Sequence, residues 1–175
     1  MLFSFLKKPV PRFLLTVLTL YLFFYLIYNL WIHPNETIDL FVVDFTILLS
    51  RLALEAMGYT VFTGTERVIG VDGTGGLWIG DNCNGITLFI LFAVFIMAYK
   101  GNVKTKIIFI TLGILSLQLL NIFRVIGLAI LDTYSRAWTE FNHTYTFNIL
   151  IYGYIFFLWM LWVNKYAGKN ISSKQ

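Results

Sequence analysis

Three residues of this chain have side chains suited to acyl-transfer chemistry, and each lies in or beside an apolar stretch. Cys83 is the only cysteine among 175 residues. It therefore has no internal disulfide partner, and one cysteine cannot supply the ligands of a cysteine-based zinc site. Arg124 lies inside a long apolar stretch, where an arginine is costly and is a functional-site candidate. His143 precedes the last apolar stretch. A cysteine, a histidine and an arginine can serve as nucleophile, general base and oxyanion stabiliser, with no metal or cofactor.

Each of these residues also fits a structural role when it is taken alone. Cys83 could be a small apolar side chain buried in the core. Arg124 could extend its guanidinium to the lipid headgroups. His33, at the end of the first apolar stretch, is a rival to His143 as the base, although the neighbouring Pro34 indicates that His33 marks a helix end.

The composition predicts a polytopic membrane protein. The chain is 58% hydrophobic and 18% aromatic, and its mean hydropathy of +0.76 exceeds that of soluble domains. A helix needs about 20 apolar residues to cross a bilayer. Four stretches reach or approach that length: residues 13–32, 83–99, 107–131 and 147–163.

Positive charge predicts the orientation. Lysine and arginine cluster before the first span, between the second and third spans, and in the tail at residues 165–175. With four spans these clusters all lie on the cytoplasmic side, as the positive-inside rule requires. All nine acidic residues then fall outside. The isoelectric point near 9.2 therefore reflects membrane topology, and we expect no nucleic-acid partner.

Residues 37–57 are apolar but carry four charged side chains. Asp44, Arg51 and Glu55 fall within about 40° of one another on a helix, and the spacing of Arg51 and Glu55 favours a stabilising pair. A fifth span here would move the loop lysines outside. We therefore expect an amphipathic helix on the outer surface or a re-entrant helix, and the sequence leaves these alternatives open.

Residues 59–80 predict a small external β-hairpin, because β-branched and aromatic runs flank the turn pair Asp72-Gly73. The glycines of this segment lack the context of a phosphate-binding loop, so they indicate turns and close backbone approach. The predicted fold is thus a single domain, residues 1–175. It is an all-α polytopic bundle of about four transmembrane helices, one amphipathic or re-entrant helix and this hairpin.

The topology brings the three candidate residues to one membrane face. Cys83 is expected at, or one residue before, the first turn of the second span, where the helix dipole favours a thiolate. Arg124 lies eighteen residues into the third span, about 26 Å along it and close to the outer surface. Asn121 is one turn earlier on the same face, and His143 is also on the outer side.

At these motifs the chain resembles a known family. Asp81-Asn82-Cys83-Asn84-Gly85-Ile86, then Asn121-Ile122-Phe123-Arg124, then His143 are similar in order and spacing to the signatures of the exosortase/archaeosortase family. Members often have Glu-Ala-Cys-Ser-Gly around the thiol, so Asp81, Asn82 and Asn84 differ here while Gly85 is retained. The chain is also short, like the compact members.

The resemblance implies a cysteine transpeptidase or peptidase of the cytoplasmic membrane whose site faces outside. Its partners would be exported proteins that end in a sorting motif, a hydrophobic helix and a basic tail, with an amine or water as acceptor. Cys83 would be the nucleophile, His143 the base and then acid, and Arg124 the oxyanion stabiliser, with Asn121 orienting Arg124. Lateral entry of substrate predicts an apolar groove beside Cys83.

Two other classes of function compete with this hypothesis. A non-catalytic membrane scaffold or assembly factor would use Arg124 and the outer charges to bind a partner. A small transporter would use Arg124 as its substrate site, although the other spans lack charged residues and no repeat is evident.

Overall fold

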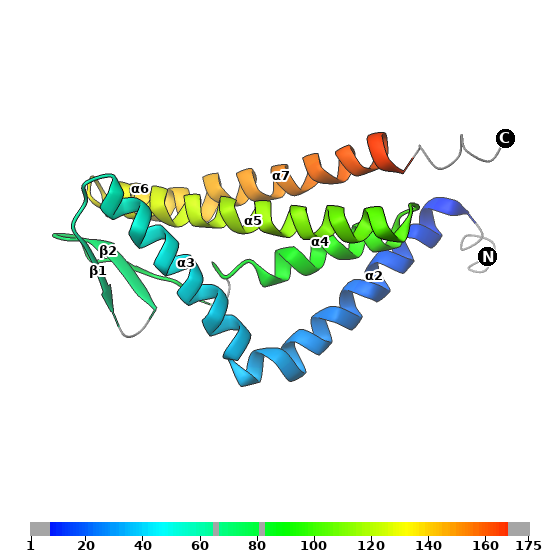
Figure 1. Cartoon of the computed structure of the whole chain (residues 1–175), viewed down its shortest axis with the longest axis horizontal. Helices are drawn as coiled ribbons and strands as arrows, with labels where there is room; N and C mark the ends of the chain where they lie inside the picture. The colour runs from blue at the N-terminus through cyan, green and yellow to red at the C-terminus, as the bar shows by residue number, and fades with distance from the viewer. Residues whose placement is uncertain (1–7, 65–66, 81–82, 168–175) are drawn as a thin grey trace.

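The structure is a computed structural model that describes residues 8–64, 67–80 and 83–167. It is mostly helical, with one small sheet (Figure 1). The predicted supporting residues Asp81 and Asn82 lie outside the described residues.

The centre of the molecule is a bundle of three apolar helices. The longest is α5 (Val103–Asp132), whose first turn is capped by Asn102 Oδ1 accepting from the Lys104 N–H at 2.9 Å. α4 (Ile86–Ala98) and α7 (Phe147–Leu161) flank it. Their shared core is aliphatic and aromatic, and it is formed by Phe92, Ile96, Leu117, Ile151, Ile155, Leu158, Trp162 and Ala167.

Two further helices form a V beside this bundle (Figure 1). α2 (Pro9–Ile27) continues through the π-turn η1 (Tyr28–Ile32) and the 3-10 turn η2 (His33–Asn35). Glu36 then adopts a left-handed conformation with φ of 52°, which reverses the chain into α3 (Thr37–Ala56). α2 packs on α4, whereas α3 packs on α5. Thr46 of α3 accepts a 2.8 Å hydrogen bond from Gln118 of α5.

The predicted pair on α3 is confirmed, because Arg51 Nε lies 2.7 Å from Glu55 Oε1. Both side chains are exposed. Val43 and Leu54, on another face of α3, are fully buried against Val125 and Ala129 of α5. The helix is therefore amphipathic and rests on the bundle along its apolar face.

The predicted hairpin is present as three antiparallel strands in the order β1-β2-β3: β1 (Val61–Gly64), β2 (Val68–Val71) and β3 (Leu77–Trp78). Gly73, with φ of 87°, lies in the connection from β2 to β3. A Cβ on Gly70 would lie 2.6 Å from the Phe62 ring and 2.7 Å from the Gly76 backbone. Close backbone approach therefore requires glycine at residue 70, and the positive φ favours glycine at residue 73.

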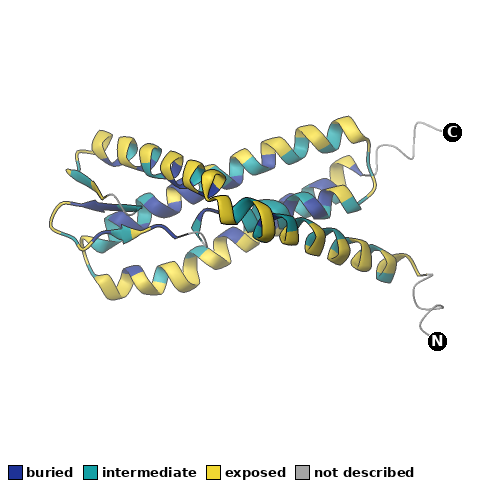
Figure 2. Cartoon of the chain, turned by 90° about the horizontal axis from the view of Figure 1, so that it is seen from below, coloured by how far each residue is buried: buried dark blue, intermediate teal, exposed yellow. Residues whose placement is uncertain are grey.

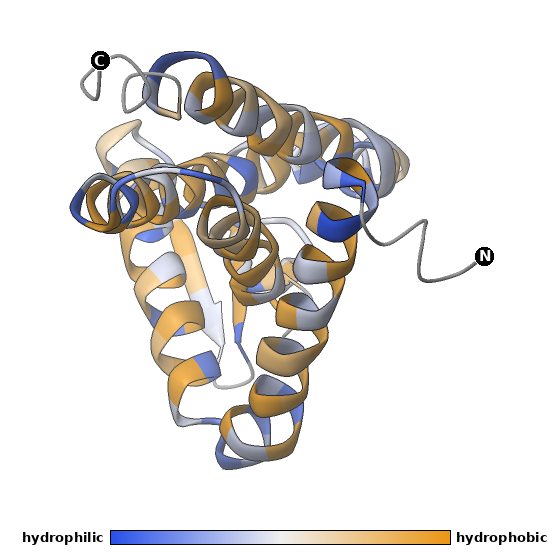
Figure 3. Cartoon of the chain, turned by 90° about the vertical axis from the view of Figure 1, so that its right-hand side faces the viewer, coloured by the Kyte–Doolittle hydropathy of each residue, from blue (hydrophilic) through white to orange (hydrophobic). Residues whose placement is uncertain are grey.

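Within the described part of the chain, three continuous helical segments are long and apolar enough to cross a membrane: Pro9–Asn35, Val103–Asp132 and Arg136–Tyr166. α4 is a shorter apolar helix of 13 residues. Residues coloured as hydrophobic predominate along these helices (Figure 3), and α2 has exposed and half-buried residues but no buried one (Figure 2). Such a surface suits lipid rather than water. The predicted all-α polytopic bundle with a small hairpin is confirmed.

The last helical segment starts earlier than residue 147, where we expected the fourth span to begin. It consists of α6 (Arg136–Phe141), the π-turn η4 (Asn142–Thr146), α7 and the π-turn η5 (Trp162–Tyr166). The polar residues before 147 interrupt the apolar pattern but not the backbone hydrogen bonding. His143 therefore lies within a helical segment rather than in a loop that precedes one.

Candidate active site

The structure brings Cys83, His143 and Arg124 together from three separate segments. Cys83 Sγ lies 3.5 Å from His143 Nε2, which is within hydrogen-bonding reach for sulphur. Arg124 Nη2 lies 3.9 Å from the same sulphur. A thiol is thus placed between an imidazole nitrogen that can exchange a proton with it and a guanidinium that can stabilise negative charge.

The two α5 residues are held rigidly. Asn121 and Arg124 are separated by three positions and share a face, and only 4% and 7% of their surfaces are exposed. Asn121 Nδ2 donates a 2.9 Å hydrogen bond to the main-chain oxygen of Cys83. This contact holds the backbone of the Cys83 segment, whereas the expected role of Asn121 in orienting Arg124 stays a prediction. Cys83 precedes the helix α4, and its carbonyl oxygen accepts from the Asn121 side chain rather than from a backbone N–H of that helix.

His143 lies in the π-turn η4. Single π-turns inside helices widen the backbone locally and are frequent at functional sites. The turn is braced by Asn142, whose Nδ2 donates to the Trp138 carbonyl at 2.8 Å. Through this irregular turn, the His143 ring meets a residue 60 positions earlier in the chain.

Cys83 itself lies farther from its helix than expected. Gly85 adopts φ of 83° and is the N-cap of α4, so the helix begins only at Ile86. Cys83 is thus three residues ahead of it rather than in or next to its first turn. Because the field of a helix dipole falls off within about one turn, Arg124 is the stronger source of positive charge at the sulphur.

The family model for transmembrane exosortases matches residues 2–164, a range that holds every residue of this site. The chain belongs to the exosortase family. No curated protein and no solved structure matches it. It is accordingly an integral membrane protein of a family that processes sorting signals.

The exosortase site continues behind Cys83 into a buried polar network that we did not predict. Asp39 of α3 is fully buried, and its carboxylate accepts hydrogen bonds from Tyr28 Oη and Asn84 Nδ2. Asn84, the neighbour of Cys83, is 1% exposed, and its Oδ1 accepts from the Ile86 N–H at 2.9 Å. Asn84 therefore joins the start of α4 to a carboxylate on another helix.

A signal for Asp39 was available in the sequence. At about 100° per residue, Asp39 points about 140° away from Asp44, off the face that Asp44 shares with Arg51 and Glu55. A carboxylate on the apolar face of an otherwise amphipathic helix predicts a buried partner.

His33, the rival base, belongs to this network. Its Nδ1 lies 3.1 Å from Asp39 Oδ2, and its side chain is 40% exposed. The histidine recorded against the Cys83 sulphur is His143. The geometry therefore favours His143 as the base and gives His33 a place beside the buried carboxylate.

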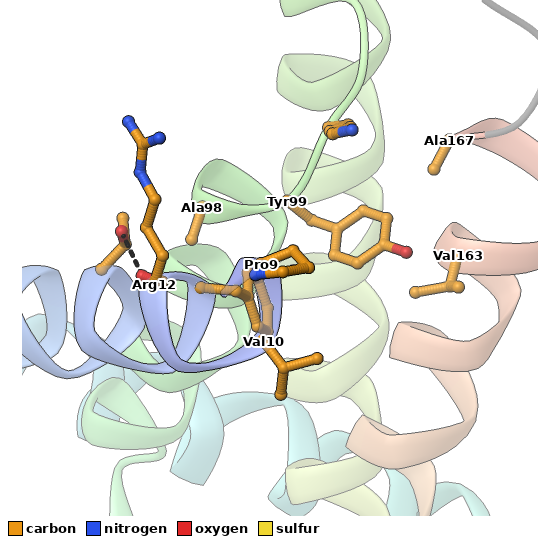
Figure 4. A pocket seen from close by; sticks show the side chains of 10 residues that line it. Pro9, Val10, Arg12, Ala98, Tyr99, Val163 and Ala167 are labelled. Atoms are coloured by element: carbon orange, nitrogen blue, oxygen red, sulfur yellow. Dashed lines mark hydrogen bonds between the residues drawn. The ribbon is translucent and has the colours of Figure 1, made fainter. Parts of the chain in front are cut away.

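A groove of about 760 Å³ lies at the other end of the exosortase bundle (Figure 4). The start of α2, the end of α4 and the last helical segment near η5 line it, and Tyr99 extends into it toward Val163 and Ala167. α4 is about 20 Å long at the helical rise, so this groove is remote from Cys83 at the opposite end of that helix. The apolar groove expected beside Cys83 stays a prediction.

Among residues 8–64, 67–80 and 83–167, no cluster of three histidine, cysteine, aspartate or glutamate side chains could hold a metal ion.

Proposed function

We propose that this exosortase-family protein is a membrane-embedded cysteine peptidase or transpeptidase, which cleaves carboxyl-terminal sorting signals of exported proteins through a thioacyl intermediate. One observation carries the proposal. The only thiol of the chain lies 3.5 Å from an imidazole nitrogen and 3.9 Å from a buried guanidinium, each on a different segment.

In the first half of the reaction, His143 Nε2 takes the thiol proton as the Cys83 sulphur attacks the carbonyl carbon of the scissile peptide bond. A carbon–sulphur bond forms and the carbonyl oxygen becomes an oxyanion, which Arg124 stabilises. When the carbon–nitrogen bond breaks, His143 gives the proton to the leaving amine. The exported protein is left as a thioester on Cys83.

In the second half, an amine or a water molecule attacks the thioester carbon. His143 takes a proton from this attacking group and returns it to the Cys83 sulphur as the carbon–sulphur bond breaks. An amine acceptor gives a new amide bond, whereas water gives a free carboxylate. The residues required are the same in both cases, since only the attacking group differs.

The proposed site faces outward. Asn121 and Arg124 lie about 27 to 32 Å along α5 from its lysine-bearing start, at 1.5 Å per residue, and the hydrocarbon core is about 30 Å thick. If the lysines mark the cytoplasmic face, the sulphur lies near the outer boundary. A substrate anchored by a carboxyl-terminal helix would present the bond just outside that helix at this depth.

A cleavage assay in membranes tests the proposal. The protein is co-expressed with exported proteins that end in a hydrophobic helix and a basic tail, and processing is followed as a size shift. We expect Cys83→Ala to abolish processing and wild-type protein to give an adduct that hydroxylamine releases, as a thioester does. Ser116→Ala, on the same bundle but bonded only to its own helix, serves as the control with unchanged processing.

Processing at the wild-type rate in Cys83→Ala would refute the mechanism. Full biological function in Cys83→Ser together with its loss in Arg124→Ala would favour the scaffold instead.

A further inference from the structure

We propose that Asp39 is a positioning residue for Cys83 and acts through the side chain of Asn84. This inference rests on the proposed function, since it concerns the geometry of the same nucleophile. Asp39 lies on α3, 44 positions before Cys83 in the sequence.

Asp39 is 0% exposed on a helix that packs against an apolar bundle. A buried carboxylate is costly unless hydrogen bonds and charge compensate it. Here it receives Tyr28 Oη and Asn84 Nδ2 at one oxygen, and His33 Nδ1 at the other. An ionised carboxylate is acceptor-only, so all three groups can donate to it at once. The Asp39 carboxylate is therefore hydrogen-bonded to three segments: η1, η2 and the residues before α4.

Asn84 transmits this arrangement to the nucleophile. Its Nδ2 donates to Asp39 while its Oδ1 accepts from the Ile86 N–H. Both ends of the amide are used, which fixes the orientation of the side chain. On the other side, Asn121 Nδ2 holds the Cys83 carbonyl oxygen. The peptide group between Cys83 and Asn84 is thus clamped from α5 and from α3.

These contacts on the peptide group between Cys83 and Asn84 matter because the reaction depends on the distances from the sulphur to its two partners. Its contacts are 3.5 Å to His143 and 3.9 Å to Arg124, and these partners come from two other segments, η4 and α5. A displacement of 1 Å can lower a reaction rate by about 100-fold. Gly85, with φ of 83°, leaves the segment free of helical restraint until Ile86. Besides the 2.8 Å hydrogen bond from the Cys83 N–H to the Gly80 carbonyl, the contacts that hold this segment are those of Asn84 and Asn121.

Iodoacetamide labelling of Cys83 tests the inference without any substrate. The reagent reacts with the thiolate, so the rate reports how well the sulphur is held against its partners. Because the chain has a single cysteine, all labelling belongs to Cys83. Protein in native membranes is used, and thermal unfolding in detergent establishes that each variant is folded.

We expect Asp39→Ala to lower the labelling rate of Cys83 by about tenfold. This rate should approach that of the His143→Ala variant, and the cleavage rate should fall in parallel. Asn84→Ala should lower the labelling rate by a similar factor. The double variant should be no slower than Asn84→Ala alone, since non-additivity marks two residues that act as a unit. Asp39→Asn should retain most of the rate, because its amide oxygen still accepts from Asn84. Asp44→Asn, the exposed acidic residue on the same helix, is the matched control and should label like wild type.

Three outcomes would overturn the inference. The first is an Asp39→Ala variant that labels at the wild-type rate or faster, which a loosened fold would also give. The second is a double variant whose labelling rate falls below that of Asn84→Ala by the full factor seen for Asp39→Ala alone, and the third is an Asp39→Asn variant that labels as slowly as Asp39→Ala. None of these outcomes bears on whether Cys83 cleaves a sorting signal. Conversely, failure to detect cleavage by wild-type protein would leave the labelling result interpretable.

Discussion

Arg124 is a buried cation whose charge faces the sulphur of Cys83. Only 7% of its surface is exposed, and among the ion pairs of the described part of the chain none involves Arg124. A buried charge without a carboxylate partner is expensive. In the proposed reaction the oxyanion would compensate it, so Arg124 would stabilise the transition state more than the neutral substrate.

Replacing Arg124 with Gln tests that role. Gln keeps amide donors and much of the side-chain volume but removes the charge. We expect the turnover rate to fall about 100-fold or more, as for loss of one oxyanion donor, with little change in KM, because the oxyanion exists only in the transition state. Steady-state cleavage at varied substrate supplies both constants. Arg12→Gln, on exposed α2, is the control. A higher KM at unchanged turnover would show instead that Arg124 binds the substrate before reaction.

At the scale of residues, the sequence predicted the three principal side chains but not the clamp around them. Cys83, Arg124 and His143 could be grouped because membrane topology places their segments at one depth. Asp39 could not be assigned in the same way. Its partners Tyr28 and Asn84 come from other segments, and pairings between distant helices depend on how the helices cross.

Short irregular elements position the site. His143 is on the π-turn η4, and Cys83 precedes a helix whose start is delayed by Gly85. Helical periodicity over residues 83–99 gave no signal of the delay, because a single glycine is compatible with either conformation. Its left-handed φ makes it the N-cap of α4 rather than a residue of the helix. The predicted helix therefore began three residues too early.

Gly85→Ala should damage both the stability and the site. Alanine in the left-handed region costs about 1–2 kcal/mol, and the added Cβ would lie 3.1 Å from the Phe89 ring. We expect a lower midpoint of thermal unfolding in detergent and slower cleavage in membranes.

Gly153→Ala is the matched control for this prediction. Gly153 lies within α7, and a Cβ there meets no atom within 4 Å. Alanine should stabilise that helix by about 0.5–1 kcal/mol and leave cleavage unchanged. Equal effects of the two substitutions would contradict the special conformation of Gly85.

The whole molecule has two chemically distinct ends. The start of α2, the start of α5 and the end of α7 lie together at one end, and α6 and the sheet lie at the other (Figure 1). The described lysines lie in or next to the elements that meet at the first end: Lys8, Lys100, Lys104, Lys106 and Lys165. The charge pattern alone predicted that the lysines lie at one end, because their placement depends on their positions in the sequence and not on side-chain packing. The V of α2 and α3 could not be predicted in the same way, since the turn at Glu36 uses a left-handed conformation that sequence pattern does not favour.

Labelling of intact cells with a membrane-impermeant thiol reagent tests the proposed orientation. Cys83 is partly exposed and, if the lysine-bearing end is cytoplasmic, its sulphur is reachable from outside. Two reporters in a Cys83→Ser background bracket α5: Tyr134→Cys and Val103→Cys, whose native side chains are 79% and 70% exposed. We expect Cys83 and the position-134 thiol to react in intact cells, and the position-103 thiol to react only after permeabilisation. The reverse pattern would place the nucleophile on the cytoplasmic side, where an exported substrate could not meet it, and would refute the proposed cleavage at the outer face even if the catalytic geometry held.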